Sequence, residues 1–179
     1  MQPQNVLQFW FTELTPQQHF TKYATLDESI RTRFGPTLGA AARCELFPWR
    51  ATPEGRLAEI LVLDQFSRNV YRDTARAFAQ DALALALAQE LVASGQDRNL
   101  PTAQRVFAYM PYMHSESALI HEQALELFAQ PGMENNLDFE RRHKAIIDRF
   151  GRYPHRNAIL GRTSTPEELA FLSEPGSSF

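Results

Sequence analysis

The sequence predicts an all-α fold, an antiparallel helix array, on the strength of three observations. Apolar residues recur at spacings of three and four along nearly the whole chain, as in amphipathic helices. No segment between turn signals alternates apolar and polar residues as a half-buried strand does. Threonine, proline and glycine residues fall where such helices would begin and end. The 179 residues can bury one core, so we expect a single helical domain over 1–179, with a frayed tail at 173–179.

The expected helices are separated by short connections, which favours antiparallel packing of neighbours. Thr52 and Thr165 can cap the helices that begin at the following prolines, and Glu168 can complete a capping box. Gly95, Gly132, Gly151 and Gly161 lie where helical patterns end. The expected ranges are Pro3–Glu13, Leu26–Phe34, Pro36–Leu46, Pro53–Val70, Thr74–Ser94, Pro101–Met110, Ser115–Gln130, Leu137–Phe150, Arg156–Leu160 and Pro166–Leu172.

The composition is that of a folded protein of a reducing compartment. Hydrophobic residues make up 44% of the chain and charged residues 22%, which excludes general disorder. The single cysteine cannot form a disulfide within the chain. The most apolar stretch, Ala82–Ala88, is much shorter than the roughly 20 residues that cross a membrane, and we find no secretory signal. We therefore expect a cytoplasmic protein without a membrane partner.

The charge distribution is uneven. The net charge of −3 argues against general binding to nucleic acid. The segment Arg141–Arg162 nevertheless carries +6, and the basic residues of the chain are mostly arginine, which binds carboxylate or phosphate in a planar, two-pronged geometry. The arginines therefore point either to a small anionic molecule or acidic peptide as partner, or to pairing with acids of the same chain. The sequence does not predict the oligomeric state.

A first polar segment lies on the expected helix Pro53–Val70. With a helical turn of about 100° per residue, Asp64 and Arg68 fall on the same stripe as Leu57 and Leu61. Apolar residues also cover the opposite side, so the polar stripe is expected to be buried. Asp64 and Arg68 then either form an internal salt bridge or pair with groups from elsewhere, since a buried unpaired charge is very unfavourable.

A second polar segment contains His114 and Glu116, between two expected helices. Glu116 can complement the dipole of the helix that we expect to begin at Ser115. His114 lies just before that helix and is read either as a base or ligand-binding donor, or as a surface residue.

A third segment runs through the end of the expected helix Leu137–Phe150 and the turn after it. His143 shares the apolar face of that helix, where a histidine is either inert and hydrogen-bonded or functional. In the following turn the arginines, with the first N–H groups of the next helix, can bind an anion. The candidates of this segment besides His143 are Arg149, Arg152, His155, Arg156 and Asn157.

Motifs of established chemistry are missing from the sequence. There is no glycine-rich phosphate loop, no Gly-x-Ser-x-Gly elbow, no Cys-x-x-Cys and no His-Glu-x-x-His. The histidines and acids have no metal-ligand spacing, so we expect no metal and predict no cofactor.

Three motifs resemble those of a bacterial family known as domain of unknown function 924. They are Leu63-Asp64-Gln65-Phe66-Ser67-Arg68-Asn69, His114-Ser115-Glu116, and Arg149-Phe150-Gly151-Arg152-Tyr153-Pro154-His155-Arg156-Asn157 followed by Leu160-Gly161-Arg162. The similarity extends over nearly the full chain. It implies a superhelical, tetratricopeptide-like arrangement of antiparallel helices, and it implies no activity.

These observations leave three hypotheses. In the first, the three segments converge on a pocket for a small anionic ligand, with or without acid–base catalysis, and His143, His114 and Asp64 are the catalytic candidates. The ligand-binding candidates are then Arg68, Glu116, Arg149, Arg152, His155, Arg156 and Asn157. In the second, the chain is a tetratricopeptide-like module that binds proteins or peptides. In the third, the polar groups form a structural ion-pair network.

Overall fold

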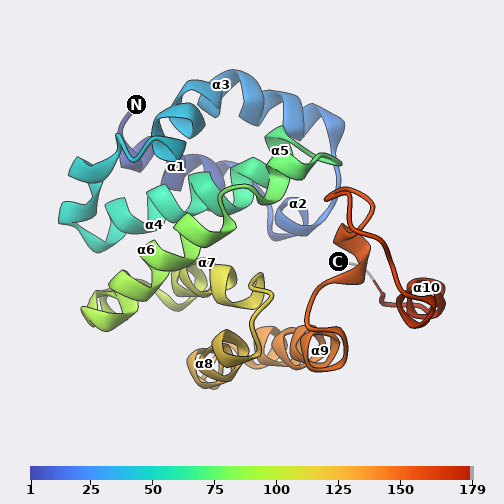
Figure 1. The fold of residues 1–179 in the computed structure, drawn as a ribbon. Helices are drawn as coiled ribbons and strands as arrows, with labels where there is room; N and C mark the ends of the chain where they lie inside the picture. The colour runs from blue at the N-terminus through green and yellow to red at the C-terminus, as the bar shows by residue number, and fades with distance from the viewer. Residues whose placement is uncertain (178–179) are drawn as a thin grey trace.

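Helices follow one another through residues 1–177, the part of the chain that the computed structural model describes (Figure 1). No strand occurs within these residues, which confirms the all-α prediction. The α-helices are α1 Pro3–Gln8, α2 Pro16–Phe20, α3 Ala24–Ala42, α4 Pro53–Leu61, α5 Ser67–Val70, α6 Asp81–Ala93, α7 Thr102–Met113, α8 Ala118–Phe128, α9 Glu134–Phe150 and α10 Pro166–Leu172. Wider π-helical turns form Phe9–Glu13 and Val62–Phe66, and short 3-10 turns form Phe47–Ala51, Ala75–Phe78, Gln96–Asn99 and Pro154–Arg156.

The predicted helix ends at the threonine caps and at Gly151 are confirmed. The side chain of Thr52 accepts a hydrogen bond from the N–H of Gly55, and Thr165 forms a complete capping box with Glu168. Gly151 ends α9 with a φ of 68°, in the left-handed region that glycine adopts without steric penalty. These local signals depend on neighbouring residues only, which is why the sequence reveals them.

Two helices pass through a proline, and here the predicted ends are wrong. α3 continues through Pro36 where two helices were expected, and α7 continues through Pro111 to Met113. A proline inside a helix removes one backbone hydrogen bond. Packing offsets this loss, because Leu38 in α3 and Tyr112 in α7 are buried in the core beyond the prolines.

Other predicted boundaries are wrong as well. The expected helix Thr74–Ser94 is split, and its second part, α6, begins at Asp81, whose carboxylate pairs with arginines from other segments. α8 begins at Ala118 rather than at Ser115. The helix expected at Arg156–Leu160 is a 3-10 turn over Pro154–Arg156, and α2 and the turn Phe47–Ala51 were not predicted.

The core is centred on α4 and the π-helical turn Val62–Phe66. These segments pack against α1, α3, α6 and α7, and every residue from 57 to 67 is buried. A smaller apolar cluster, Ile146, Ile147 and Tyr153, joins α9 to the turn after it. In Figure 1, α8 and α9 lie below α4, and α10 lies to the right. α8 contributes Ala124 and Phe128 to the larger core.

The arrangement of helices does not test two of the predictions. The tetratricopeptide-like superhelix and the single domain remain predictions. Of the tail expected to fray, residues 173–177 form turns, and the buried Ser177 hydroxyl donates to the backbone oxygen of Leu172 at 3.2 Å. Residues 178–179 lie outside the described part. Within residues 1–177, no helix has both the length and the apolar character needed to cross a membrane.

The start of α4 generates a prediction about stability. A Cβ atom added to Gly55 would lie 1.9 Å from the backbone oxygen of Trp49, so Gly55→Ala must displace backbone. We expect Gly55→Ala to lower the free energy of unfolding by about 1–3 kcal/mol or more, measured by urea denaturation. The matched control is Gly35→Ala within α3, where a Cβ meets nothing within 4 Å and helix propensity adds about 0.5–1 kcal/mol. Equal effects of the two substitutions would contradict this account of Gly55.

Candidate functional site

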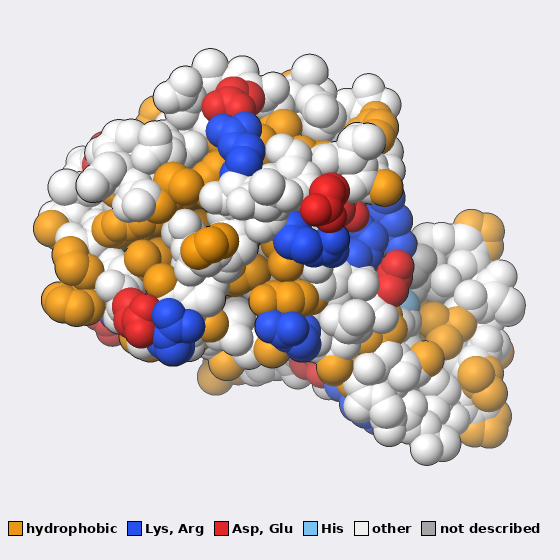
Figure 2. Space-filling model, turned by 90° about the horizontal axis from the view of Figure 1, so that it is seen from above, with side chains coloured by type: hydrophobic (Ala, Val, Ile, Leu, Met, Phe, Trp, Pro, Cys, Tyr) orange, Lys and Arg blue, Asp and Glu red, His pale blue; other side chains and the backbone are white. Residues whose placement is uncertain are grey.

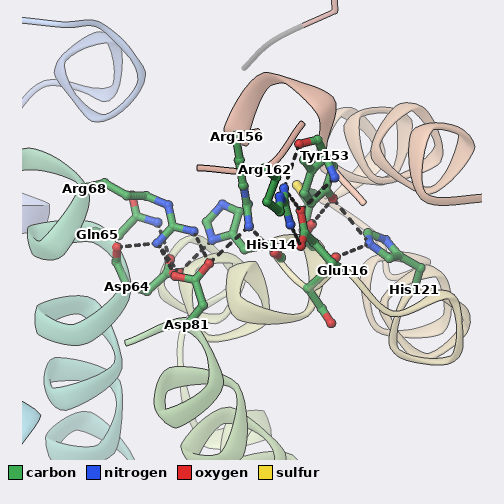
Figure 3. A network of polar contacts seen from close by, with 12 residues as sticks. Asp64, Gln65, Arg68, Asp81, His114, Glu116, His121, Tyr153, Arg156 and Arg162 are labelled. Atoms are coloured by element: carbon green, nitrogen blue, oxygen red, sulfur yellow. Dashed lines mark hydrogen bonds and ion pairs between the residues drawn. The ribbon is translucent and has the colours of Figure 1, made fainter. Parts of the chain in front are cut away.

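The three polar segments of the sequence meet at one place (Figure 3). Asp64 comes from the π-helical turn after α4, His114 from the end of α7, and Arg156 from the 3-10 turn after α9. Asp64 bonds to His114, and Arg156 bonds to the backbone oxygen of His114 at 3.1 Å. We call Asp64, Arg68, Asp81, His114 and Arg156 the central cluster.

Asp64 and His114 form a carboxylate–imidazole pair. Oδ1 of Asp64 lies 2.7 Å from Nδ1 of His114, and Asp64 is only 1% exposed. Gln65 donates to the other carboxylate oxygen at 2.6 Å, and Nη1 of Arg68 lies 3.0 Å from Oδ1. The helix widens to a π-turn at Asp64 and Gln65, a distortion that is frequent at functional sites.

The charges of the pair follow from this environment. Burial acts to raise the pKa of Asp64, but the charge of Arg68 and the contact with His114 outweigh it and hold that pKa well below its usual range. Burial and then the charge of Arg68 lower the pKa of His114, although Asp64 opposes them. His114 is therefore neutral at pH 7, with its proton on Nδ1 facing the carboxylate. Its Nε2 carries the lone pair and makes no hydrogen bond to residues 1–177.

Asp81 joins the two arginines of the central cluster. Arg68 donates to both oxygens of Asp81, at 2.9 and 3.0 Å. Nη1 of Arg156 approaches the same carboxylate at 3.3 Å. Two carboxylates and two guanidinium groups therefore balance, and with His114 neutral the central cluster has no net charge.

Arg156 is buried, and only one of its guanidinium nitrogens makes hydrogen bonds to the described residues. Its side chain is 8% exposed and contacts the rings of Phe78 and Tyr153, with its central carbon 4.6 and 4.5 Å from the two ring centres. Both hydrogen bonds of the guanidinium come from Nη1. Nε is buried without a hydrogen-bond partner, and Nη2 makes no hydrogen bond to the described residues. Burial and then the charge of Arg68 lower the pKa of Arg156.

Glu116 and Asn157 hold the turn that carries Arg156. Glu116 accepts from the backbone N–H of Tyr153 at 2.8 Å and binds Arg162 through both carboxylate oxygens, at 2.6 and 2.9 Å. Arg162 also donates to the side chain of Asn157 at 3.0 Å. These two candidates are thus occupied by protein contacts, and the role of Arg162 was missed from the sequence.

Arg149 and Arg152 are turned toward α10. Arg152 binds both carboxylate oxygens of Glu168, at 2.7 and 2.8 Å. Arg149 pairs with Glu167 at 3.0 Å, and both of those side chains are exposed. The structure therefore does not bring these two arginines into the central cluster.

His143 and His155 both lie next to Tyr153, with ring centres 5.8 and 5.6 Å from that ring. His143 is 7% exposed and donates from Nδ1 to the backbone oxygen of Phe139 at 2.8 Å. Burial lowers the pKa of His143 to about 3 and that of His155 to about 4. Both imidazoles are neutral at pH 7 and surround the tyrosine that stacks on Arg156.

A fully buried layer lies behind Tyr153. Its hydroxyl donates to the backbone oxygen of Met113 at 2.6 Å. His121 and Glu140, both with no exposed surface, lie 2.6 Å apart, and His121 also bonds to the backbone of Ser115 at 2.9 Å. These contacts fix the end of α7, α8 and α9 relative to the turn that carries Arg156.

The surroundings of the central cluster differ from the open pocket that the first hypothesis expects. Figure 2 shows charged side chains of both signs, with a small pale-blue histidine surface beside them, near the junction of the larger body and the C-terminal part. Two surface hollows lie elsewhere: one is lined by Phe9, Glu13, Leu14, Gln18, Tyr23, Thr25, Leu26 and Ser29, the other by Phe128, Ala129, Gln130, Pro131, Glu134 and Leu137. No group of three or more His, Cys, Asp or Glu side chains within residues 1–177 is placed to hold a metal ion.

The buried Asp64 generates a second stability prediction. Asp64→Asn leaves Arg68 with a weakened partner in a buried site, so we expect a loss of about 3–5 kcal/mol in the free energy of unfolding. Asp138→Asn is the matched control, because Asp138 and Arg142 have the same i,i+4 spacing but are exposed, and it should lose less than about 1 kcal/mol. Chemical denaturation measures both, and similar losses would show that burial of Asp64 is unimportant.

Comparisons with known proteins place the chain in a family. A family model described as a bacterial protein of unknown function, DUF924, matches residues 6–176. The structure of a protein of unknown function, ATU0120 from Agrobacterium tumefaciens, superimposes with a TM-score of 0.91 at 38% sequence identity, over 96% of this chain and 96% of that one. No curated protein matches the chain. The chain therefore belongs to the bacterial DUF924 family, as its three motifs predicted.

Proposed function

We propose that the central cluster binds a small anionic molecule at Arg156 and that His114 exchanges a proton with it. The observation that supports this proposal is the free edge of Arg156, by which we mean the side of the guanidinium formed by Nε and Nη2. Nε and Nη2 are the two parallel donors with which arginine binds an oxyanion, and neither has a partner among residues 1–177. A buried N–H without a partner is unfavourable, and an anion at this edge satisfies both donors.

His114 has the features of an acid–base group. A histidine whose Nδ1–H is held by a carboxylate presents a basic Nε2 in a fixed orientation. Figure 3 shows the imidazole between Arg68 and Arg156. Asp64 is then a positioning residue, which sets the tautomer and stabilises the imidazolium when a proton is taken up.

The remaining hypotheses have less support. An acidic peptide needs several arginines free on one surface, whereas Arg149 and Arg152 already pair with Glu167 and Glu168. A purely structural ion-pair network accounts for Asp64, Arg68 and Asp81, but it leaves the free edge of Arg156 unexplained.

We also infer that the protein acts in the bacterial cytoplasm. The family description, which names bacterial proteins, and the single cysteine support this. The net charge of −3 supports a small-molecule partner over nucleic acid.

The test of binding uses the Nε–H signals of the arginine side chains in NMR spectra. Titration with acetate and with inorganic phosphate should shift the Arg156 signal in a saturable way for at least one of them. Arg156→Lys keeps the charge and removes the fork, so the affinity should fall at least about tenfold, or by about 1.4 kcal/mol. Arg149→Lys, the control on the exposed surface, should bind as the wild type does. Equal affinities in all three proteins would refute the binding site.

A separate measurement tests the role of His114. A bound anion next to the imidazole favours its protonated form, so saturation should raise the pKa of His114, followed through its Cε1–H signal. If the pKa of His114 stays constant while the Arg156 signal saturates, the anion binds away from the imidazole and proton exchange is excluded.

A further inference from the structure

The geometry around Arg156 points to a carboxylate as the bound group, in preference to a phosphate dianion. This inference rests on the proposed function and names the class of ligand that the same site takes. It follows from three features: the number of donors that Arg156 offers, the balance of charge, and the aromatic neighbours of the guanidinium, which add no further donor.

The donors match a group with two oxygens. The free edge of Arg156 offers Nε and Nη2, one for each oxygen of a carboxylate. Phosphate sites usually add backbone N–H groups from a loop or a helix start. In this turn the N–H of Tyr153 donates to Glu116, the N–H groups of Arg156 and Asn157 donate to backbone oxygens within the turn, and Pro154 has none. The remaining oxygens of a phosphate would find no donor among these groups.

The charge balance favours a ligand of low charge. Asp64 and Asp81 neutralise Arg68 and Arg156, and His114 is neutral. Arg162, which donates to the backbone oxygen of Tyr153 next to this turn, is bound by Glu116 through both oxygens. A carboxylate therefore gives the cluster a charge of −1, whereas a phosphate dianion gives −2 in a largely buried place, which is less favourable.

The aromatic neighbours of the guanidinium add no further donor. Arg156 contacts the rings of Phe78 and Tyr153. A carboxylate needs no donor beyond Nε and Nη2, one for each of its oxygens. The remaining oxygens of a phosphate need further donors, and the two rings supply none. The hydroxyl of Tyr153 is already engaged, because it donates to the backbone oxygen of Met113.

The experiment compares matched ligand pairs with the same organic group. Benzoate is titrated against phenylphosphonate, and acetate against methylphosphonate, at pH 8, where the phosphonates are dianions. Calorimetry or the Arg156 Nε–H signal gives the dissociation constants. We expect the carboxylate of each pair to bind at least about tenfold more tightly, and the difference to shrink at pH 6, where the phosphonates carry less charge.

The outcomes separate the two proposals. Phosphonates that bind as tightly as the carboxylates or more tightly, and lose that affinity in Arg156→Lys, would overturn the carboxylate preference and leave the anion site standing. No saturable binding of any of the four anions, or binding that is unchanged in Arg156→Lys, would overturn the anion site and the preference together. Arg149→Lys serves again as the control, and it should keep the preference of the wild type.

Discussion

The buried carboxylate of Asp64 is the constraint around which the rest of the structure is arranged. It lies on the central helix of the core, where an unpaired charge is very unfavourable. Its partners come from the same helix and from the end of α7, through Gln65, Arg68 and His114. Arg68 also forms an ion pair with Asp81 at the start of α6, and Asp81 in turn pairs with Arg156 from the turn after α9. One buried charge thus ties the larger core to the C-terminal helices.

The distinction between scaffold and candidate site depends on which polar groups are already satisfied. The sequence made ligand-binding candidates of Glu116, Asn157 and Arg152 because of their type and position. In the structure each of them forms hydrogen bonds to other parts of the chain. Their contacts position the turn after α9, so we assign these three residues to the scaffold. Arg156 and His114 differ because each has one side fixed by the protein and one side without a partner among residues 1–177. That combination is what a rigid binding site requires.

Helix periodicity was enough to place Asp64 and His143 inside the fold, and local capping signals were enough for Thr52, Thr165 and Gly151. Both kinds of information are contained in a few neighbouring residues. The continuation of helices through Pro36 and Pro111 was not predictable in this way, because it depends on burial of residues further along. The same limit explains why Asp81, Phe78 and Tyr153 were missed as site residues. Asp81 resembles an ordinary acid at a helix start, and the two aromatic residues resemble core residues until their distance to Arg156 is known.

The free edge of Arg156 is the feature that internal pairing does not explain. A network that served only stability would gain by closing on itself, because each buried N–H without a partner is unfavourable by about 1–3 kcal/mol. The surrounding contacts leave the edge open: Asp81 and the His114 carbonyl bond only to Nη1, and the guanidinium lies over the rings of Phe78 and Tyr153, which offer its other N–H groups no oxygen acceptor at that edge. The π-turn at Asp64 adds a second departure from regular structure in the same place. Two unfavourable features side by side are more consistent with a site held ready for a ligand than with a salt-bridge network selected for stability.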